Sequence, residues 1–92
     1  MLSLRWLPSA LADLDSIVNY IAARDEAAAY RLWTAIERAV EKIPERPELY
    51  RQGSVKGTRE LVVHPNYFVV YQFAADVIEI VAIVHSHRHY PA

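Results

Sequence analysis

The C-terminal residues VHSHRHYPA carry a dense group of chemically active side chains. Three of the four histidines, at positions 85, 87 and 89, alternate here with Arg88 and precede Tyr90. Alternate side chains of an extended chain point the same way, and neutral imidazoles bind zinc, nickel or copper. No Asp or Glu accompanies them to orient the rings, and chain ends fray. We therefore expect no metal, with His87 and His89 facing solvent.

A second group of candidates consists of the cations Lys56, Arg59 and Arg88, which flank or lie on predicted strands. Two guanidinium groups that converge on one sheet edge would suit a phosphate, because each offers a planar fork of donors. Alternatively, Arg59 pairs with Glu60, Glu79 or a helix carboxylate and only keeps the sheet soluble. The sequence leaves both interpretations open.

Composition excludes several classes of site. The chain has 92 residues, a formal charge of −1 and no cysteine, which removes disulfides, thiolate zinc sites and Cys nucleophiles. No glycine-rich phosphate loop, nucleophile elbow or HExxH pattern occurs. Pro8 and Asp13 come too early for a signal peptide, and no run is long enough to span a membrane. We expect one cytoplasmic domain over residues 1–92.

The first half of the chain predicts a strand and two helices. Residues 2–7 alternate as a half-buried strand does, and Pro8 ends it. Ser9 can cap the first helix, and Asp25 lies near the start of the second, which Pro44 ends. The apolar stripe of the first helix is Leu11, Leu14, Ile17, Val18 and Ile21. The stripe of the second is Ala29, Trp33, Ile36, Val40 and Ile43.

The second half changes to the period of strands. Residues 58–63, 67–73 and 77–84 are apolar or β-branched and are separated by short turns, which predicts an antiparallel meander. Residues 44–54 are expected to be irregular. With the N-terminal strand as a fourth member, the order is β-α-α-β-β-β. This is an α+β domain with an antiparallel helical hairpin on one face of a mainly antiparallel sheet.

Several segments together resemble one protein family. They are LADLDSIVNYIA (11–22), P-x-x-Y-R-x-G (47–53), GTREL (57–61), NYFVVY (66–71), VIEIVAIVH (77–85) and the closing H-x-x-R-x-Y-P (85–91). In order and spacing they resemble the RelE/ParE superfamily of type II toxin–antitoxin toxins. The resemblance covers nearly the whole chain and implies the same β-α-α-β-β-β fold.

The resemblance implies two alternative activities. RelE-like members cleave mRNA in the ribosomal A site without a metal, whereas ParE-like members poison DNA gyrase and are not nucleases. Members of both kinds are neutralised by a small antitoxin, here ParD- or RelB-like, in a hetero-oligomer, and neither activity needs a cofactor. A third possibility is a degenerate toxin that only binds its antitoxin.

The RelE-like alternative implies a catalytic set in this sequence. Arg59 and Arg88 would hold the phosphate, Tyr90 or His85 would act as acid or base, and Lys56 would assist. Cleavage transfers the 2′-hydroxyl onto the adjacent phosphate, so charge must be stabilised and protons moved at once. The slightly acidic balance and the sparse cations of KGTR (56–59) favour the ParE-like alternative instead.

An antitoxin is expected to bind the helical hairpin. An amphipathic peptide helix can lay its apolar side in a groove beside the two helices. We expect it to cover those parts of residues 11–21 or 33–40 that the core does not use. The candidate contacts are Leu11, Leu14, Val18, Trp33, Ile36 and Val40.

Overall fold

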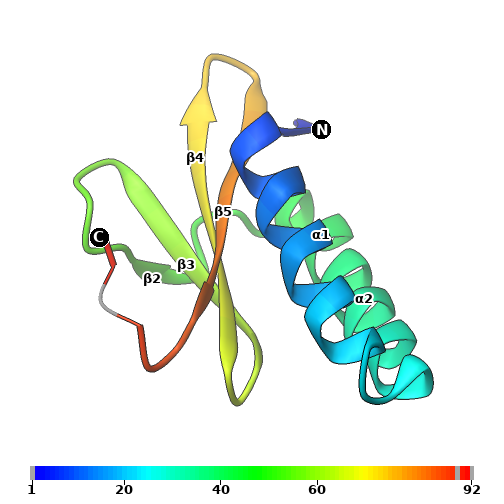
Figure 1. The fold of residues 1–92 in the computed structure, drawn as a ribbon. Coiled ribbons are helices and arrows are strands. Elements are labelled where there is room, and N and C mark those ends of the chain that lie inside the picture. Colours follow the sequence, from blue (N-terminus) through cyan, green and yellow to red (C-terminus); the bar gives the residue numbers. More distant parts are fainter. Residues whose placement is uncertain (1, 89, 92) are drawn as a thin grey trace.

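The computed structural model describes residues 2–88, 90 and 91. Two helices lie side by side against one face of a sheet (Figure 1). The elements are β1 (Ser3–Trp6), α1 (Pro8–Ala22), α2 (Glu26–Glu41), the short 3-10 helix η1 (Ile43–Glu45), β2 (Arg51–Gln52), β3 (Thr58–His64), β4 (Tyr67–Ala74) and β5 (Val77–His85). No helix in these ranges is long and apolar enough to cross a membrane.

The sheet confirms the expected α+β class and adds one strand to it. Its five strands lie in the order β1-β5-β4-β3-β2, with β1 parallel to β5 and the other neighbours antiparallel. The added strand, β2, has only two residues and lies in a segment that we expected to be irregular. It forms because Arg51 sits opposite Glu60 of β3 and donates from Nε to its carboxylate at 2.9 Å.

Local sequence explains how each helix begins. Pro8 is the first residue of α1, where a missing N–H costs nothing because that group has no partner within a helix. Asp25 precedes α2 and its carboxylate accepts the Ala28 N–H at 3.0 Å. A break of three residues between the helices turns the chain back, so that they pack as an antiparallel hairpin.

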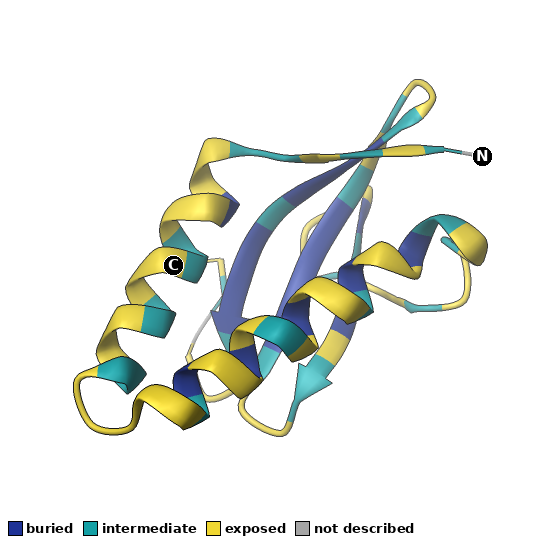
Figure 2. Ribbon diagram, turned by 90° about the vertical axis from the view of Figure 1, so that its right-hand side faces the viewer, coloured by how far each residue is buried: buried dark blue, intermediate teal, exposed yellow. Residues whose placement is uncertain are grey.

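The main core lies between the helical hairpin and the sheet. Figure 2 shows the buried sides of both helices turned toward the strands, with their outer faces exposed. The largest fully buried side chains of this core come from α2, η1, β4 and β5. They include Ile36, Val40, Ile43, Val69, Tyr71, Ile78 and Ile80.

The predicted stripe of α2 was wrong at one position. Leu32 is 6% exposed and belongs to the core, whereas Trp33 is 39% exposed. The two residues flank the same stripe on opposite sides, and the sheet covers the Leu32 side. Trp33 instead packs edge-on against Tyr30, with ring centroids 6.1 Å apart. On α1, Leu11 is likewise half exposed rather than in the core.

A second, smaller cluster covers the face of the sheet away from the helices. Its buried members are Phe68, Val70, Ala82 and Val84, and Tyr90 of the C-terminal segment packs against them. In Figure 1 this segment lies on the side of the sheet opposite the helices. β4 and β5 are therefore covered on both faces, which is typical of central strands with nearly continuous apolar sequences.

Two buried carboxylates hold the outer strands on this second face. Glu79 of β5 accepts hydrogen bonds from Arg5 of β1 and, at 2.9 Å, from Nε2 of Gln72 of β4. Glu60 of β3 accepts from Arg51 and from the Ser54 backbone N–H. Each carboxylate thus ties an edge strand or loop to the centre of the sheet.

Replacing Glu79 with Gln is expected to flatten the dependence of stability on acid pH. Hydrogen bonds from Gln72 and Arg5 hold the pKa of Glu79 below its ordinary value of 4.5. A lowered folded-state pKa adds stability that is complete above the unfolded-state pKa and disappears as pH falls through the folded-state pKa. In urea unfolding below pH 4.5, the native chain should lose stability more steeply than Glu79→Gln. Glu37→Gln, at an exposed site, is the control, and equal slopes for the native chain and Glu79→Gln would contradict this role.

Candidate functional site

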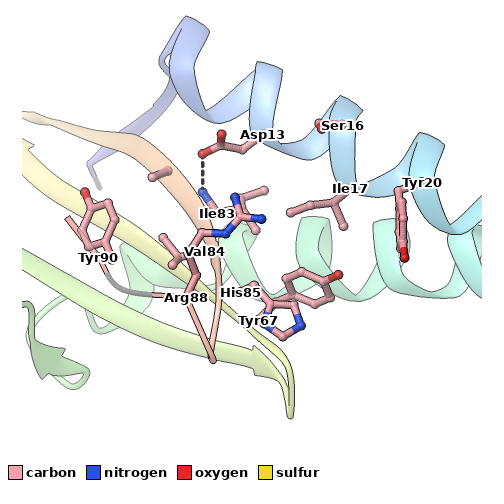
Figure 3. A pocket seen from close by; sticks show the side chains of 11 residues that line it. Asp13, Ser16, Ile17, Tyr20, Tyr67, Ile83, Val84, His85, Arg88 and Tyr90 are labelled. Atoms are coloured by element: carbon pink, nitrogen blue, oxygen red, sulfur yellow. Dashed lines mark hydrogen bonds between the residues drawn. The ribbon is translucent and has the colours of Figure 1, made fainter. Parts of the chain in front are cut away.

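Along its outer edge, β5 pairs with β1 in its first half and lies beside α1 in its second half. β1 pairs with β5 only from Val77 to Ile80, so residues 81–85 have no strand on that side within the described chain. α1 passes along this uncovered half and leaves a hollow of about 680 Å³ between itself, β5 and the C-terminal segment. Figure 3 shows the side chains that line this β5-edge hollow.

Two side chains of α1 take the place of a neighbouring strand. The Ser9 hydroxyl donates to the Val81 carbonyl at 2.6 Å, and the Asp13 carboxylate accepts the Ile83 N–H at 3.0 Å. Ser9 and Asp13 are four residues apart and so lie on one side of the helix. They hold α1 beside the uncovered edge of β5.

Aromatic and imidazole rings line up at the far end of β5. Ring centroids are 5.8 Å apart between His64 and Tyr67, 5.1 Å between Tyr67 and His85, and 5.3 Å between His85 and His87. Nδ1 of His85 accepts the His87 backbone N–H at 3.2 Å. A neutral imidazole that accepts at Nδ1 carries its proton on Nε2. His85 is therefore arranged as a hydrogen-bond donor, and it would lose this bond if it took up a proton as a base.

Tyr90 and Arg88 complete the β5-edge hollow. Burial raises the pKa of Tyr90, and the nearby negative charges of Glu60 and Asp13 raise it further. Its phenol therefore stays protonated at neutral pH. Arg88 is exposed, and Figure 3 shows its side chain directed from the C-terminal segment toward α1. The hollow thus presents donors, from His85, Arg88 and Tyr90, to whatever enters it.

A second hollow, of about 400 Å³, lies at the start of β3 and contains Lys56 and Arg59. The exposed ring of Phe73 forms part of its wall. Arg59 donates from one guanidinium nitrogen to the backbone carbonyls of Tyr50, at 2.7 Å, and Glu48, at 3.3 Å. One of its guanidinium nitrogens therefore holds the preceding loop in place. The carboxylates of Glu60 and Glu79, the alternative partners considered for Arg59, are taken by Arg51 and Arg5.

One of the two interpretations that the sequence left open, the convergence of Arg59 and Arg88 on one sheet edge, does not occur in the structure. β3 and β5 are both antiparallel to β4, so they run in the same direction, and the start of one lies far from the end of the other. Arg59 is level with Ile80, whereas His64 is level with His85. That offset of about five residues corresponds to about 16 Å along a strand. The five candidate catalytic residues therefore fall into two hollows.

Asp13 and Tyr67 were not among the predicted site residues. The position of Asp13 in the first half of a helix suggested only a favourable interaction with the helix dipole. Tyr67 lies on a strand face rich in aromatic residues, which is typical of a core, and it is only partly buried. Nothing in either pattern indicates that β5 has an uncovered edge, which is what brings both residues to the hollow.

The candidate antitoxin contacts differ in how much surface they offer. Leu11 is 50% exposed and Trp33 is 39% exposed, whereas Ile36 and Val40 are 0% and 1% exposed. Ile36 and Val40 point into the core between the helices and the sheet, so they offer almost no surface to a partner. Leu14 and Val18 are half-buried and offer only part of their side chains.

The structure describes only two of the three histidines in the C-terminal cluster, His85 and His87. His87 is exposed, as expected, and His89 lies outside the described residues. Among residues 2–88, 90 and 91, no group of three or more His, Cys, Asp or Glu side chains is placed to hold a metal ion.

Comparison with known proteins places this chain in a family. Residues 4–90 match the family model described as the ParE toxin of a type II toxin–antitoxin system, parDE. The chain belongs to the ParE toxin family. It is thus a toxin of the RelE/ParE superfamily, as the sequence motifs indicated.

Individual relatives resemble it along nearly their whole length. A protein named "Putative toxin Y4kP" from Sinorhizobium fredii is 39% identical over 96% of this chain and 92% of its own length. Toxin RelE2 of Caulobacter vibrioides is 37% identical over 90% of this chain and 93% of its own. The structure of a chromosomal ParDE system from P. aeruginosa has the same fold, with a TM-score of 0.82 and 22% identity, over 92% of this chain and 96% of that one.

Replacing Gly53 with Ala is expected to destabilise the loop that forms the second hollow of this ParE-family toxin. A Cβ at Gly53 would lie 2.3 Å from the Thr58 hydroxyl oxygen, which is fixed by its 2.6 Å bond to the Val55 carbonyl. Overpacking of this kind lowers the free energy of unfolding by about 1–3 kcal/mol, measurable in urea. Thr58→Ala removes the clashing atom, so Gly53→Ala should cost less in that background.

Gly57→Ala is the matched control for this test. Gly57 has a φ of +86°, and a Cβ added there would meet no atom within 4 Å, so the control loses only the free energy of backbone strain, about 1 kcal/mol. Thr58→Ala should leave that cost unchanged. A Gly53→Ala penalty that is the same with and without Thr58→Ala would show that the contact with Thr58 is not its cause.

Proposed function

We propose that this ParE-family toxin stops growth by binding DNA gyrase in the cytoplasm, and that a small antitoxin encoded beside it keeps it inactive. The observation that carries the proposal is the separation of its cations into two hollows. Ribosome-dependent RNA cleavage needs a phosphate clamp, a base and an acid around one phosphate. This chain holds Lys56 and Arg59 in one hollow and His85, Arg88 and Tyr90 in the other.

Hydrogen bonding at His85 and the burial of Tyr90 also support a binding role over a nuclease role. The Nδ1 hydrogen bond orients His85 as a donor, and the raised pKa of Tyr90 keeps its phenol protonated. Neither residue is then arranged to remove a proton from a ribose hydroxyl. The formal charge of −1 gives little of the counterion release that draws proteins to ribosomal RNA.

A RelE-like nuclease is the second candidate, and one observation favours it. His85, Arg88 and Tyr90 do line a common hollow, and a relative named RelE2 is 37% identical. In that case Arg88 alone would hold the phosphate. A degenerate chain that binds antitoxin without toxicity is the third candidate, and it would use the same surface.

The exposed apolar surface supports an antitoxin partner. Leu11 and Tyr20 on α1 are 50% and 64% exposed, and Trp33 and Tyr30 on α2 are 39% and 65% exposed. These side chains lie on the exposed surface of the helical hairpin, where an amphipathic segment of a partner could cover them. The similar P. aeruginosa structure is described as a ParDE toxin–antitoxin system.

Expression of the chain in cells should induce the SOS response and filamentation while translated messages stay uncut. Purified protein should inhibit supercoiling by gyrase, and the neighbouring small open reading frame should suppress both effects. Arg59→Ala and Arg88→Ala test the nuclease alternative, because loss of a phosphate-holding cation lowers cleavage by about 100-fold or more. Arg31→Ala, on the exposed side of α2, is the control.

Primer extension on a translated message separates the outcomes. A-site cuts that disappear in Arg88→Ala would overturn the gyrase proposal in favour of the RelE-like activity. If cells that express the chain without its antitoxin grow normally, and the purified chain still binds the antitoxin, only the degenerate binding module remains.

A further inference from the structure

The uncovered edge of β5 has two backbone groups that α1 does not satisfy. Along a strand, the residues whose N–H and C=O groups point to the same edge alternate. Ser9 binds the Val81 carbonyl and Asp13 binds the Ile83 N–H, so residues 81, 83 and 85 face the hollow. The His85 carbonyl accepts the Arg88 N–H at 2.9 Å in the following turn.

This leaves the Ile83 carbonyl and the His85 N–H without a hydrogen-bond partner within the part of the chain that the structure describes. They lie on either side of Val84 and both open into the β5-edge hollow. Unpaired strand edges are templates for another extended chain. A helix cannot use such groups, because its own backbone groups are already paired.

We propose that the β5-edge hollow binds an extended segment of the antitoxin, which adds to β5 as a short parallel strand. One residue of that segment would donate its N–H to the Ile83 carbonyl and accept the His85 N–H. The inference rests on the proposed function, since it names a contact within the toxin–antitoxin complex.

The direction of the added strand follows from which groups are taken. An antiparallel neighbour exchanges hydrogen bonds with both groups of a single residue. At Ile83 the N–H is held by Asp13, and at His85 the carbonyl is held by Arg88, so neither residue offers both groups. A parallel neighbour instead bonds to the carbonyl of one residue and the N–H of the residue two positions later. The remaining pair has this pattern, and the strand would run in the direction that β1 already takes along β5.

The walls of the hollow indicate the chemistry of the segment. Ile17 and Tyr67 line its helix side, and Val84 and Tyr90 line the opposite side, so both faces of the added strand would meet apolar or aromatic groups. The parallel direction carries the segment toward Arg88, which is in neither of the ion pairs found among the described residues. An apolar segment followed by a carboxylate therefore fits this hollow.

Amide hydrogen exchange by NMR tests the strand directly. The chain is compared free and in complex with the antitoxin from the neighbouring open reading frame. Exchange of the His85 amide should slow by about 100-fold or more in the complex, because it gains a hydrogen bond in a covered site. The Ser86 amide is the internal control, since it already donates to the Asn66 carbonyl at 2.7 Å in the free chain.

A charge reversal tests the end of the segment. Arg88→Glu should weaken antitoxin binding by about tenfold or more, through loss of an ion pair and new repulsion. The control Arg31→Glu, on the exposed side of α2, should leave the affinity unchanged. Changing the facing acidic residue of the antitoxin to Lys should restore the affinity of Arg88→Glu.

The possible failures are distinguishable. If the neighbouring protein forms no complex, both the antitoxin partnership and the strand are overturned. If a complex forms and protects α1, but the His85 amide exchanges as fast as in the free chain, only the added strand is overturned. Slowed exchange at His85 with unchanged exchange at Ser86 is the result that the inference requires.

Discussion

The shortness of β1 is the constraint on which the rest of the structure depends. Pro8 begins α1 only two residues after β1 ends, so the chain leaves the sheet when β5 is half covered. The Leu7 N–H makes the last strand-like bond, to the Ile80 carbonyl at 2.9 Å. Beyond it, Ser9 and Asp13 supply single hydrogen bonds of about 1 kcal/mol each where a strand would supply a ladder. The hollow, the position of α1 and the unsatisfied backbone groups all follow from this change of partner.

The meander sets a second limit, on chemistry. Three consecutive antiparallel strands place the start of the first and the end of the third at opposite ends of the sheet. Arg59 at the start of β3 and Arg88 just after the end of β5 therefore cannot meet around one ligand. A catalytic clamp for a phosphate would need them to converge, whereas a protein partner can contact both ends across a broad surface. The arrangement therefore suits recognition of a macromolecule better than chemistry on one bond.

The sequence predicted those features that depend on periodicity. Alternation and the spacings of three and four placed four of the strands and both helices, because each burial pattern follows directly from backbone geometry. The choice between Leu32 and Trp33 could not be predicted, since both lie at the edges of one stripe and only the position of the sheet decides between them. β2 was missed because two residues carry no period, and its formation depends on the pairing of Arg51 with Glu60.

The candidate site was harder to predict because much of it is main chain. Reactive side chains point to His85 and Arg88, but the groups left without partners within residues 2–88, 90 and 91 are a backbone carbonyl and an amide N–H, which nearly every residue possesses. Only the register of β1 on β5 shows which of them are free. A site of this kind tolerates exchange of the side chains around it, provided that the strand and the helix keep their places. It can persist in a fold that reaches a TM-score of 0.82 with a structure sharing only 22% of its sequence, because backbone geometry is what the two chains have in common.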